Sequence, residues 1–197
     1  MNSAEWIHRH LNPHGSHSPV QLTKFSRKNL AKVFRVLGYK RGAEIGVAEG
    51  RYSKQMCEMN PGVRLLCVDC WARYHGNVRG GPQNQHDRNF EMAHINLQPF
   101  DAEIVRAFSL DAARNVELES LDFVYIDANH AFDYVMQDII EWSKRVRRGG
   151  IVAMHDYYHF RDAGVVEAVD AYVLAHGITE WFLTNERKEK SAFWVKR

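Results

Sequence analysis

Short apolar runs alternate with stretches of helical spacing along most of the chain. Between Leu22 and Leu37 apolar positions recur every three or four residues, which predicts a helix that Gly38 ends. Helical spacing returns near 52–59, 86–97, 131–146 and 162–176. Strand-like apolar runs lie at Gly42–Gly46, Val63–Asp69, Ala102–Phe108, Leu121–Asp127 and Ile151–His155. Strands that alternate with helices predict right-handed crossovers and a mostly parallel sheet.

The end of the chain departs from this alternation. Thr179–Thr184 and Ala192–Lys196 are strand-like, and the charged turn Asn185–Lys190 joins them as an antiparallel hairpin. We therefore predict an α/β fold with a Rossmann-like, seven-stranded, mostly parallel sheet, a C-terminal antiparallel hairpin and helices on both faces. Residues 1–38, a histidine-containing irregular segment and the first helix, are expected to pack on a single domain formed by 39–197.

Composition narrows the function only slightly. Of 197 residues, 45% are hydrophobic and 25% charged, as in ordinary globular proteins. A net charge of +2 gives no reason to expect a nucleic-acid surface. The sequence has no apolar stretch of the roughly 18 residues that a membrane span needs, no apolar signal region near its start, and an odd count of three cysteines. We expect a cytoplasmic protein that does not enter a membrane.

A glycine turn follows the first apolar strand. Gly46 ends that strand, Gly50 lies four residues on, and a helix begins near Tyr52. Glycines let backbone N–H groups approach a ligand, and Ser53 could add a hydroxyl donor. Asp69 ends the next strand, where a carboxylate can accept hydrogen bonds from both hydroxyls of a ribose. Together they indicate an adenosine-containing ligand, although a tight turn without a ligand and a solvated Asp69 are the alternatives.

The spacing of the glycines bears on which ligand binds. A nicotinamide fingerprint needs G-x-G-x-x-G, and this chain has Gly46-Val-Ala-Glu-Gly50. Glu44, inside the strand, would suit the positive end of S-adenosylmethionine (SAM) and would repel a pyrophosphate. Glu44-Ile-Gly46-Val-Ala-Glu-Gly50 resembles motif I of class I SAM-dependent methyltransferases, and the resemblance extends over residues 40–160. It implies that Asp69 binds the ribose and that Ser109 meets the adenine edge, unless Ser109 only caps a helix.

The second half resembles one branch of that family, the small-molecule O-methyltransferases. The branch pattern I-D-x-x-H, D-x-x-x-W and G-G-x-x-x-x-H-D is carried by Ile126-Asp127-Ala-Asn-His130, Asp138-Ile-Ile-Glu-Trp142 and Gly149-Gly150 to His155-Asp156. His130 stands where the catechol-type enzymes have a lysine base, which implies a general base, although His130 could instead cap the next helix. Asp127 is expected to contact cofactor and acceptor, Asp138 to lie on a helix surface, and Trp142 to pack in the core.

The same resemblance raises the question of a metal. Asp127 and Asp156 match two metal-ligating aspartates of the cation-dependent members, and carboxylates suit Mg²⁺. Those enzymes have asparagine after the second aspartate, whereas this chain has Tyr157. A third oxygen ligand would then have to come from water, Asn129 or His155, and a histidine ligand would favour a transition metal.

The resemblance implies a SAM-dependent methyltransferase that methylates a hydroxyl of a small acceptor, such as a sugar or natural product, with or without a divalent cation. The competing functions are a non-catalytic SAM-binding scaffold and an NAD-dependent Rossmann oxidoreductase. The glycine spacing and the terminal hairpin disfavour the oxidoreductase. Asp127 and His130 are the predicted catalytic residues. The oligomeric state stays open, with a homodimer among the options.

Overall fold

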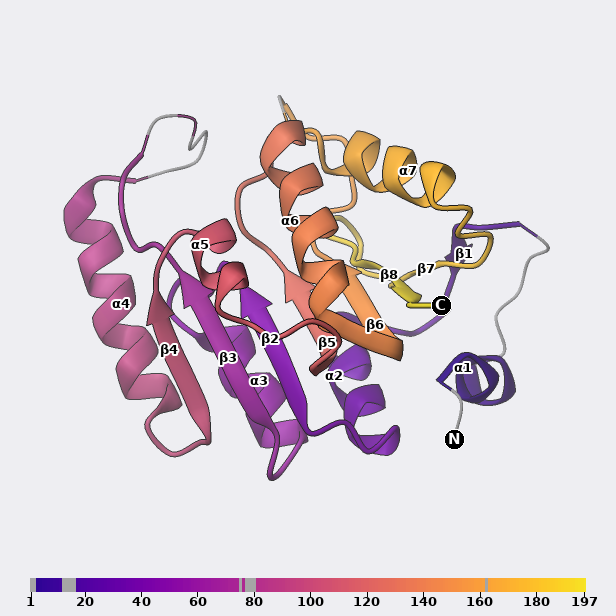
Figure 1. The fold of residues 1–197 in the computed structure, drawn as a ribbon, viewed down its shortest axis with the longest axis horizontal. Coiled ribbons are helices and arrows are strands. Elements are labelled where there is room, and N and C mark those ends of the chain that lie inside the picture. The colour runs from indigo at the N-terminus through magenta and orange to yellow at the C-terminus, as the bar shows by residue number, and fades with distance from the viewer. Residues whose placement is uncertain (1–2, 12–16, 75, 77–80, 162) are drawn as a thin grey trace.

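The computed structural model describes residues 3–11, 17–74, 76, 81–161 and 163–197. Its strands form one sheet of eight in the order β1-β7-β8-β6-β5-β2-β3-β4 (Figure 1). The strands are β1 (Val20–Gln21), β2 (Arg41–Ile45), β3 (Arg64–Asp69), β4 (Ala102–Arg106), β5 (Leu121–Ile126), β6 (Val146–Met154), β7 (Phe182–Leu183) and β8 (Ala192–Val195).

The pairing confirms the predicted mixed sheet. The central strands from β4 to β6 are all parallel, and β8 runs antiparallel to both β6 and β7. The sheet has one more strand than the seven predicted, because the two-residue β1 pairs in parallel with β7. Such a short strand has too few residues to show an alternating pattern.

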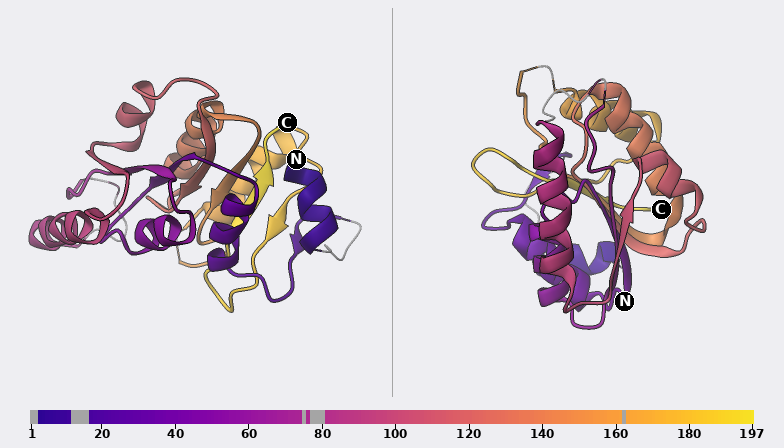
Figure 2. Two further views of the ribbon diagram at one scale, coloured as in Figure 1. Left: turned by 90° about the horizontal axis from the view of Figure 1, so that it is seen from below. Right: turned by 90° about the vertical axis from the view of Figure 1, so that its left-hand side faces the viewer.

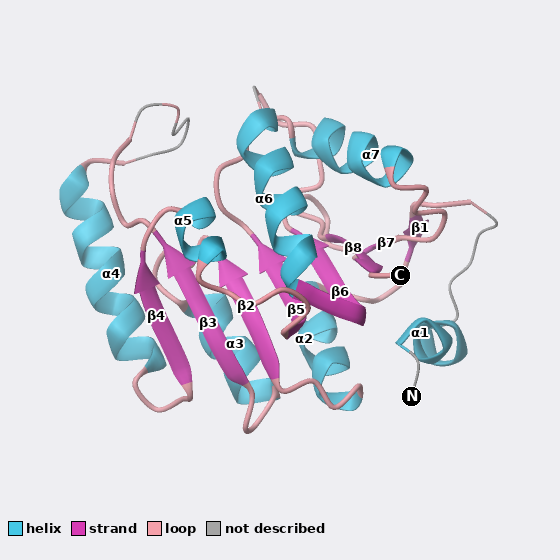
Figure 3. Cartoon of the chain, in the orientation of Figure 1, coloured by secondary structure: helices cyan, strands magenta, loops and turns pink. Residues whose placement is uncertain are grey.

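Helices cover both faces of the sheet (Figures 2 and 3). They are α1 (Ser3–Leu11), α2 (Arg27–Val36), α3 (Arg51–Met59), α4 (Gln83–Leu97), α5 (Ser109–Arg114), α6 (Phe132–Arg145) and α7 (Val165–Ala175). The prediction of an irregular segment before residue 20 was wrong for Ser3–Leu11, which is helical, while residues 12–16 lie outside the described part. Ile7 of α1 is fully buried, so this helix packs on the core.

Strand alternation divides the core into two layers. Phe123 and Tyr125 of β5 pack with α1, α2, α3 and α4, whereas Val124 and Ile126 pack with α5, α6 and α7. Such near-continuous apolar strands are expected where a parallel sheet is buried on both faces. Within the described residues, no helix is long and apolar enough to cross a membrane.

Local sequence signals set the helix ends near the first half of the sheet. At the start of α2 the Ser26 backbone N–H donates to Asn29 Oδ1 (2.9 Å), and the two side chains complete a capping box. This cap explains why α2 begins at Arg27, later than the apolar spacing predicted. Gly38, at φ +73°, ends the helix as expected.

Candidate functional site

A pocket of about 440 Å³ opens at the carboxyl ends of the central strands. It lies where β2 separates β3 on one side from β5 on the other, the place where open α/β sheets bind ligands because neighbouring loops diverge there. Its lining includes Gly46, Asp69, Trp71, Ser109, Asp127 and Asp138.

Gly46 forms the pocket floor between β2 and β5. Its φ is +89°, and a Cβ atom at this position would lie 2.0 Å from the carbonyl oxygen of Asp127. Only glycine therefore lets the turn pass so close to the end of β5. Gly50 also has a positive φ, +74°, and caps α3, but it does not line the pocket.

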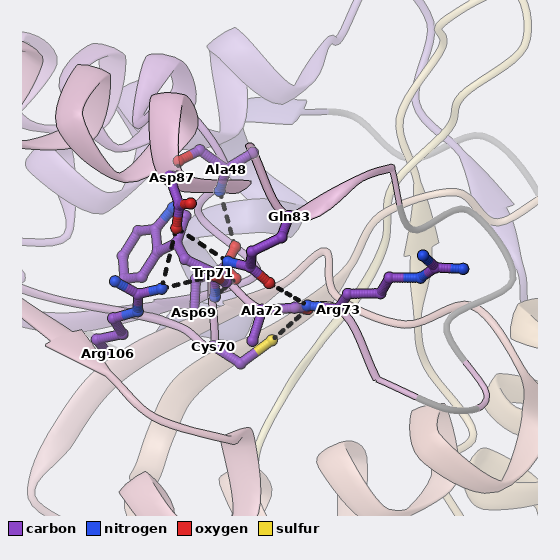
Figure 4. Close-up of polar contacts among 9 residues, drawn as sticks. All are labelled: Ala48, Asp69, Cys70, Trp71, Ala72, Arg73, Gln83, Asp87 and Arg106. Atoms are coloured by element: carbon purple, nitrogen blue, oxygen red, sulfur yellow. Dashed lines mark hydrogen bonds and ion pairs between the residues drawn. The ribbon is translucent and has the colours of Figure 1, made fainter. Parts of the chain in front are cut away.

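Asp69 is held at the pocket wall by two backbone donors. Its Oδ2 accepts from the Ala48 N–H and its Oδ1 from the Trp71 N–H, both at 2.9 Å (Figure 4). The buried Trp71 indole N–H donates to the Ala48 carbonyl oxygen at 2.8 Å. Arg106 and Gln83 in turn donate to the carbonyl oxygen of Trp71. The carboxylate thus has a fixed direction and retains lone pairs for further donors.

A second group of polar side chains lies at the ends of β5 and β6, adjoining the pocket at Asp127. His130 Nε2 lies 2.5 Å from Asp156 Oδ2 and 3.9 Å from Asp127 Oδ1. One ligand atom from each of these three residues falls within 4.8 Å of the others, the range of a metal site. Asp156 has a φ of +58°, an uncommon conformation for a non-glycine residue that recurs at functional sites. Burial raises the pKa of Asp156, but hydrogen bonds from His130 and His155 outweigh burial and hold that pKa well below its usual range.

His155 connects this group to α2. Its Nδ1 lies 3.4 Å from Asp127 Oδ2 and 3.3 Å from Asp156 Oδ1, and Arg27 Nη1 lies 3.2 Å from its Nε2. Burial lowers the pKa of His155, but the two carboxylates outweigh this and raise it to about 10. Arg27 acts in the opposite sense, because a guanidinium N–H can donate only to an unprotonated nitrogen. The charge on His155 therefore depends on whether His155 itself or another cation neutralises Asp127 and Asp156.

A family model described as a methyltransferase domain matches residues 43–157, more than half of the chain. The chain belongs to this methyltransferase family. The match begins within β2 and ends just after Asp156, so it spans the pocket and both aspartates.

Solved structures share the fold of this methyltransferase at low sequence identity. One is the O-methyltransferase TomG from Streptomyces achromogenes, involved in tomaymycin synthesis and in complex with SAM, which is 16% identical with a TM-score of 0.64 over 100% of this chain and 90% of that one. Another is an O-methyltransferase from Bacillus cereus in complex with S-adenosylhomocysteine (SAH), 16% identical with a TM-score of 0.60 over 98% and 96%. A search of curated protein sequences gave no match.

The methyltransferase brings together four of the seven predicted cofactor residues. Gly46, Asp69, Ser109 and Asp127 line the pocket, whereas Glu44, Gly50 and Ser53 do not. Glu44 lies on the α2–α3 side of β2, is 2% exposed, and accepts a hydrogen bond from Ser53 Oγ. Its carboxyl group is therefore one layer below the pocket and does not contact a ligand there.

Some residues around the site have other roles than the sequence predicted. Asp138, expected on a helix surface, is 5% exposed and lines the pocket. Tyr157 points away from Asp127, because its hydroxyl donates to Asp170 and its ring packs on Trp181. Asn129 donates to Tyr74 and accepts from the Ala131 N–H, so both ends of its amide are already engaged.

The burial of Glu44 in the methyltransferase gives a prediction about pH. Desolvation, with smaller contributions from Asp127 and Asp69, raises its pKa from 4.5 to about 8, against the Ser53 hydrogen bond and Arg27. Between these two values the folded protein holds a proton that the unfolded chain releases, so the free energy of unfolding should fall as pH rises. The greatest slope from one such group is about 1.4 kcal/mol per pH unit.

Glu44→Gln should remove this contribution, since an amide does not ionise and can still accept from Ser53. Urea unfolding at pH 5, 6, 7 and 8 would measure the slope in the wild type, in Glu44→Gln and in Glu103→Gln, which changes an exposed glutamate of β4. We expect a flatter profile only for Glu44→Gln. The same slope in all three proteins would show that Glu44 titrates normally.

Proposed function

We propose that the protein is a SAM-dependent O-methyltransferase for a small hydroxylated acceptor, with His130 as the general base. The observation that carries the proposal is the position of the His130–Asp156 pair beside Asp127, which lines the pocket. Solved methyltransferases of the same fold that hold SAM or SAH support the choice of cofactor.

The pocket supplies the contacts that the cofactor needs. Asp69 is placed to accept hydrogen bonds from the ribose hydroxyls, and Gly46 leaves room for the chain of the ligand above β2. Asp127 forms the pocket wall on the side of His130. SAM carries an ammonium and a sulfonium, so the carboxylates of Asp69 and Asp127 in the pocket lining favour it over a pyrophosphate ligand.

The transfer requires an in-line arrangement of acceptor oxygen, methyl carbon and sulfur. Because the Nε2–H of His130 can donate to Asp156, the ring's Nδ1 keeps a free lone pair to take the hydroxyl proton. The acceptor oxygen then forms a bond to the methyl carbon while the carbon–sulfur bond breaks, which leaves SAH. The proton stays on His130, whose positive charge Asp156 stabilises.

A divalent cation also fits the donor set at this position. Asp127 and Asp156 offer carboxylate oxygens and His130 an imidazole nitrogen, a mixed set that suits a transition metal at least as well as Mg²⁺. Such an ion would lower the pKa of an acceptor hydroxyl. It would compete with the hydrogen bond between His130 and Asp156, so the two arrangements predict different responses to chelation.

Transfer of a labelled methyl group from SAM to a panel of sugars and phenolic natural products tests this proposal. We expect a methyl ether on at least one acceptor, and full transfer after exhaustive EDTA treatment if His130 acts alone. The cation-dependent arrangement predicts that EDTA abolishes methyl transfer and that one ion among Mg²⁺, Mn²⁺ and Zn²⁺ restores it. In Asp156→Asn the same ion should fail to restore transfer. SAM binding with no transfer to any acceptor would instead favour a non-catalytic SAM-binding protein.

A further inference from the structure

Asp138 of α6 is a buried carboxyl group in the wall of the cofactor pocket. It is 5% exposed, and its Oδ1 accepts a hydrogen bond from Ser109 Oγ. The oxygen of the same serine accepts from the Trp142 indole N–H at 2.8 Å. The Ser109 hydroxyl thus gives its only proton to Asp138 and has no donor left for a ligand.

The carboxyl group of Asp138 is only partly satisfied. Among the described residues, Ser109 is its only hydrogen-bond partner, and no cation pairs with it. Burial raises the pKa of Asp138 to about 7, while the Ser109 hydrogen bond lowers it. Because Asp138 lines the pocket, a bound ligand would displace water from its second oxygen, and an acceptor left without a donor is costly. This arrangement therefore favours a ligand that brings an N–H group to that oxygen.

The pocket specifies which part of the ligand reaches Asp138. Asp69, at the end of β3, takes the ribose in the proposed function, and the methyl group must point towards Asp127 and His130. Asp138 reaches the pocket from α6, alongside Ser109 at the start of α5, on the wall that remains for the base. At the edge of the adenine base, the exocyclic amine is the group that can donate a hydrogen bond.

We propose that Asp138 recognises the exocyclic amino group of the adenine of SAM by accepting a hydrogen bond from it. The inference rests on the proposed function, and it assigns to Asp138 the base recognition that the sequence assigned to Ser109. Ser109 and Trp142 are then positioning residues that fix the direction of the carboxyl group. A site built around such a hydrogen bond discriminates strongly against a ligand that lacks the donor.

The test compares the affinity for SAH with that for its analogue in which hydrogen replaces the 6-amino group. Calorimetry would measure both ligands on the wild type and on Asp138→Leu and Asp138→Ala, which cannot accept a hydrogen bond and differ in bulk. We expect the wild type to bind SAH roughly 10–100-fold more tightly than the analogue. In both variants the two affinities should agree within about threefold. Thermal unfolding of each variant would confirm that it is folded.

Asp133→Asn is the matched control, because Asp133 lies on the same helix as Asp138 but is exposed and outside the pocket lining. It should keep the wild-type preference. A wild type that binds SAH without preference over the analogue, or a folded Asp138 variant that keeps the full preference, would overturn the inference. A wild type that binds neither ligand would instead refute the proposed function.

Discussion

His130→Ala is expected to lower the turnover of methyl transfer roughly 10²–10⁴-fold, the usual contribution of a general base. The affinity for SAM should change little, because His130 lies beyond Asp127 and is not part of the pocket lining. Loss of the ring also removes the hydrogen bond between His130 and Asp156, and this change should not alter Asp69 or the turn at Gly46. Steady-state rates at saturating SAM, with calorimetry for SAM binding, would separate the two quantities.

His159→Ala is the matched control, since His159 is exposed and pairs with Glu167 on the protein surface. Its turnover should equal that of the wild type. Equal turnover in His130→Ala would reduce His130 to a structural residue, and a large loss of SAM affinity in the same variant would place it in the cofactor site.

Gly46→Ala should lower the free energy of unfolding by about 2–5 kcal/mol and abolish measurable SAM binding. The added Cβ would lie 2.0 Å from the Asp127 carbonyl oxygen and 2.6 Å from the Ala128 Cα, both backbone atoms that cannot turn aside. Overpacking of this kind typically costs about 1–3 kcal/mol, and the positive φ adds about 1–2 kcal/mol. For a chain of this size the midpoint of thermal unfolding should fall by roughly 4–20 °C.

Gly62→Ala separates the two contributions. Gly62 has a similar φ of +81°, yet a Cβ there would have no atom within 4 Å. Its cost should be limited to the about 1–2 kcal/mol of the positive φ. Scanning calorimetry on both variants would measure the difference, and equal shifts for the two would contradict a steric role for Gly46.

Much of the fold could be predicted because the central strands are apolar on both faces and the turns between them carry glycines. The predicted run Gly42–Gly46 differs from β2 by one residue at each end. Three elements, β1, α1 and α5, were not among those predicted. The strand β1 is two residues long and α5 six, and Ile7 is the one fully buried apolar side chain of α1, so none of them leaves a clear periodic pattern.

The site was harder to predict, because its polar groups come from several layers. Strand alternation could have placed Glu44 on the opposite face from Ile45, since Glu44 packs beside Ser53 while Ile45 lines the pocket. Likewise, Asp138 and Trp142 are four residues apart on one helix face, so a buried Trp142 implied a buried Asp138. The contact between Arg27 and His155 joins distant parts of the chain and has no local signal.

Calorimetric titration with SAM and with NAD⁺ tests the central claim most directly, with Asp69→Ala beside the wild type. We predict that SAM binds the wild type, that NAD⁺ does not, and that Asp69→Ala weakens SAM binding by roughly 1.5–3 kcal/mol, or about 10–150-fold. The Ala48 and Trp71 N–H groups would lose their shared acceptor in that variant, which adds to the loss. Binding of NAD⁺ with no binding of SAM to the wild type would contradict the account.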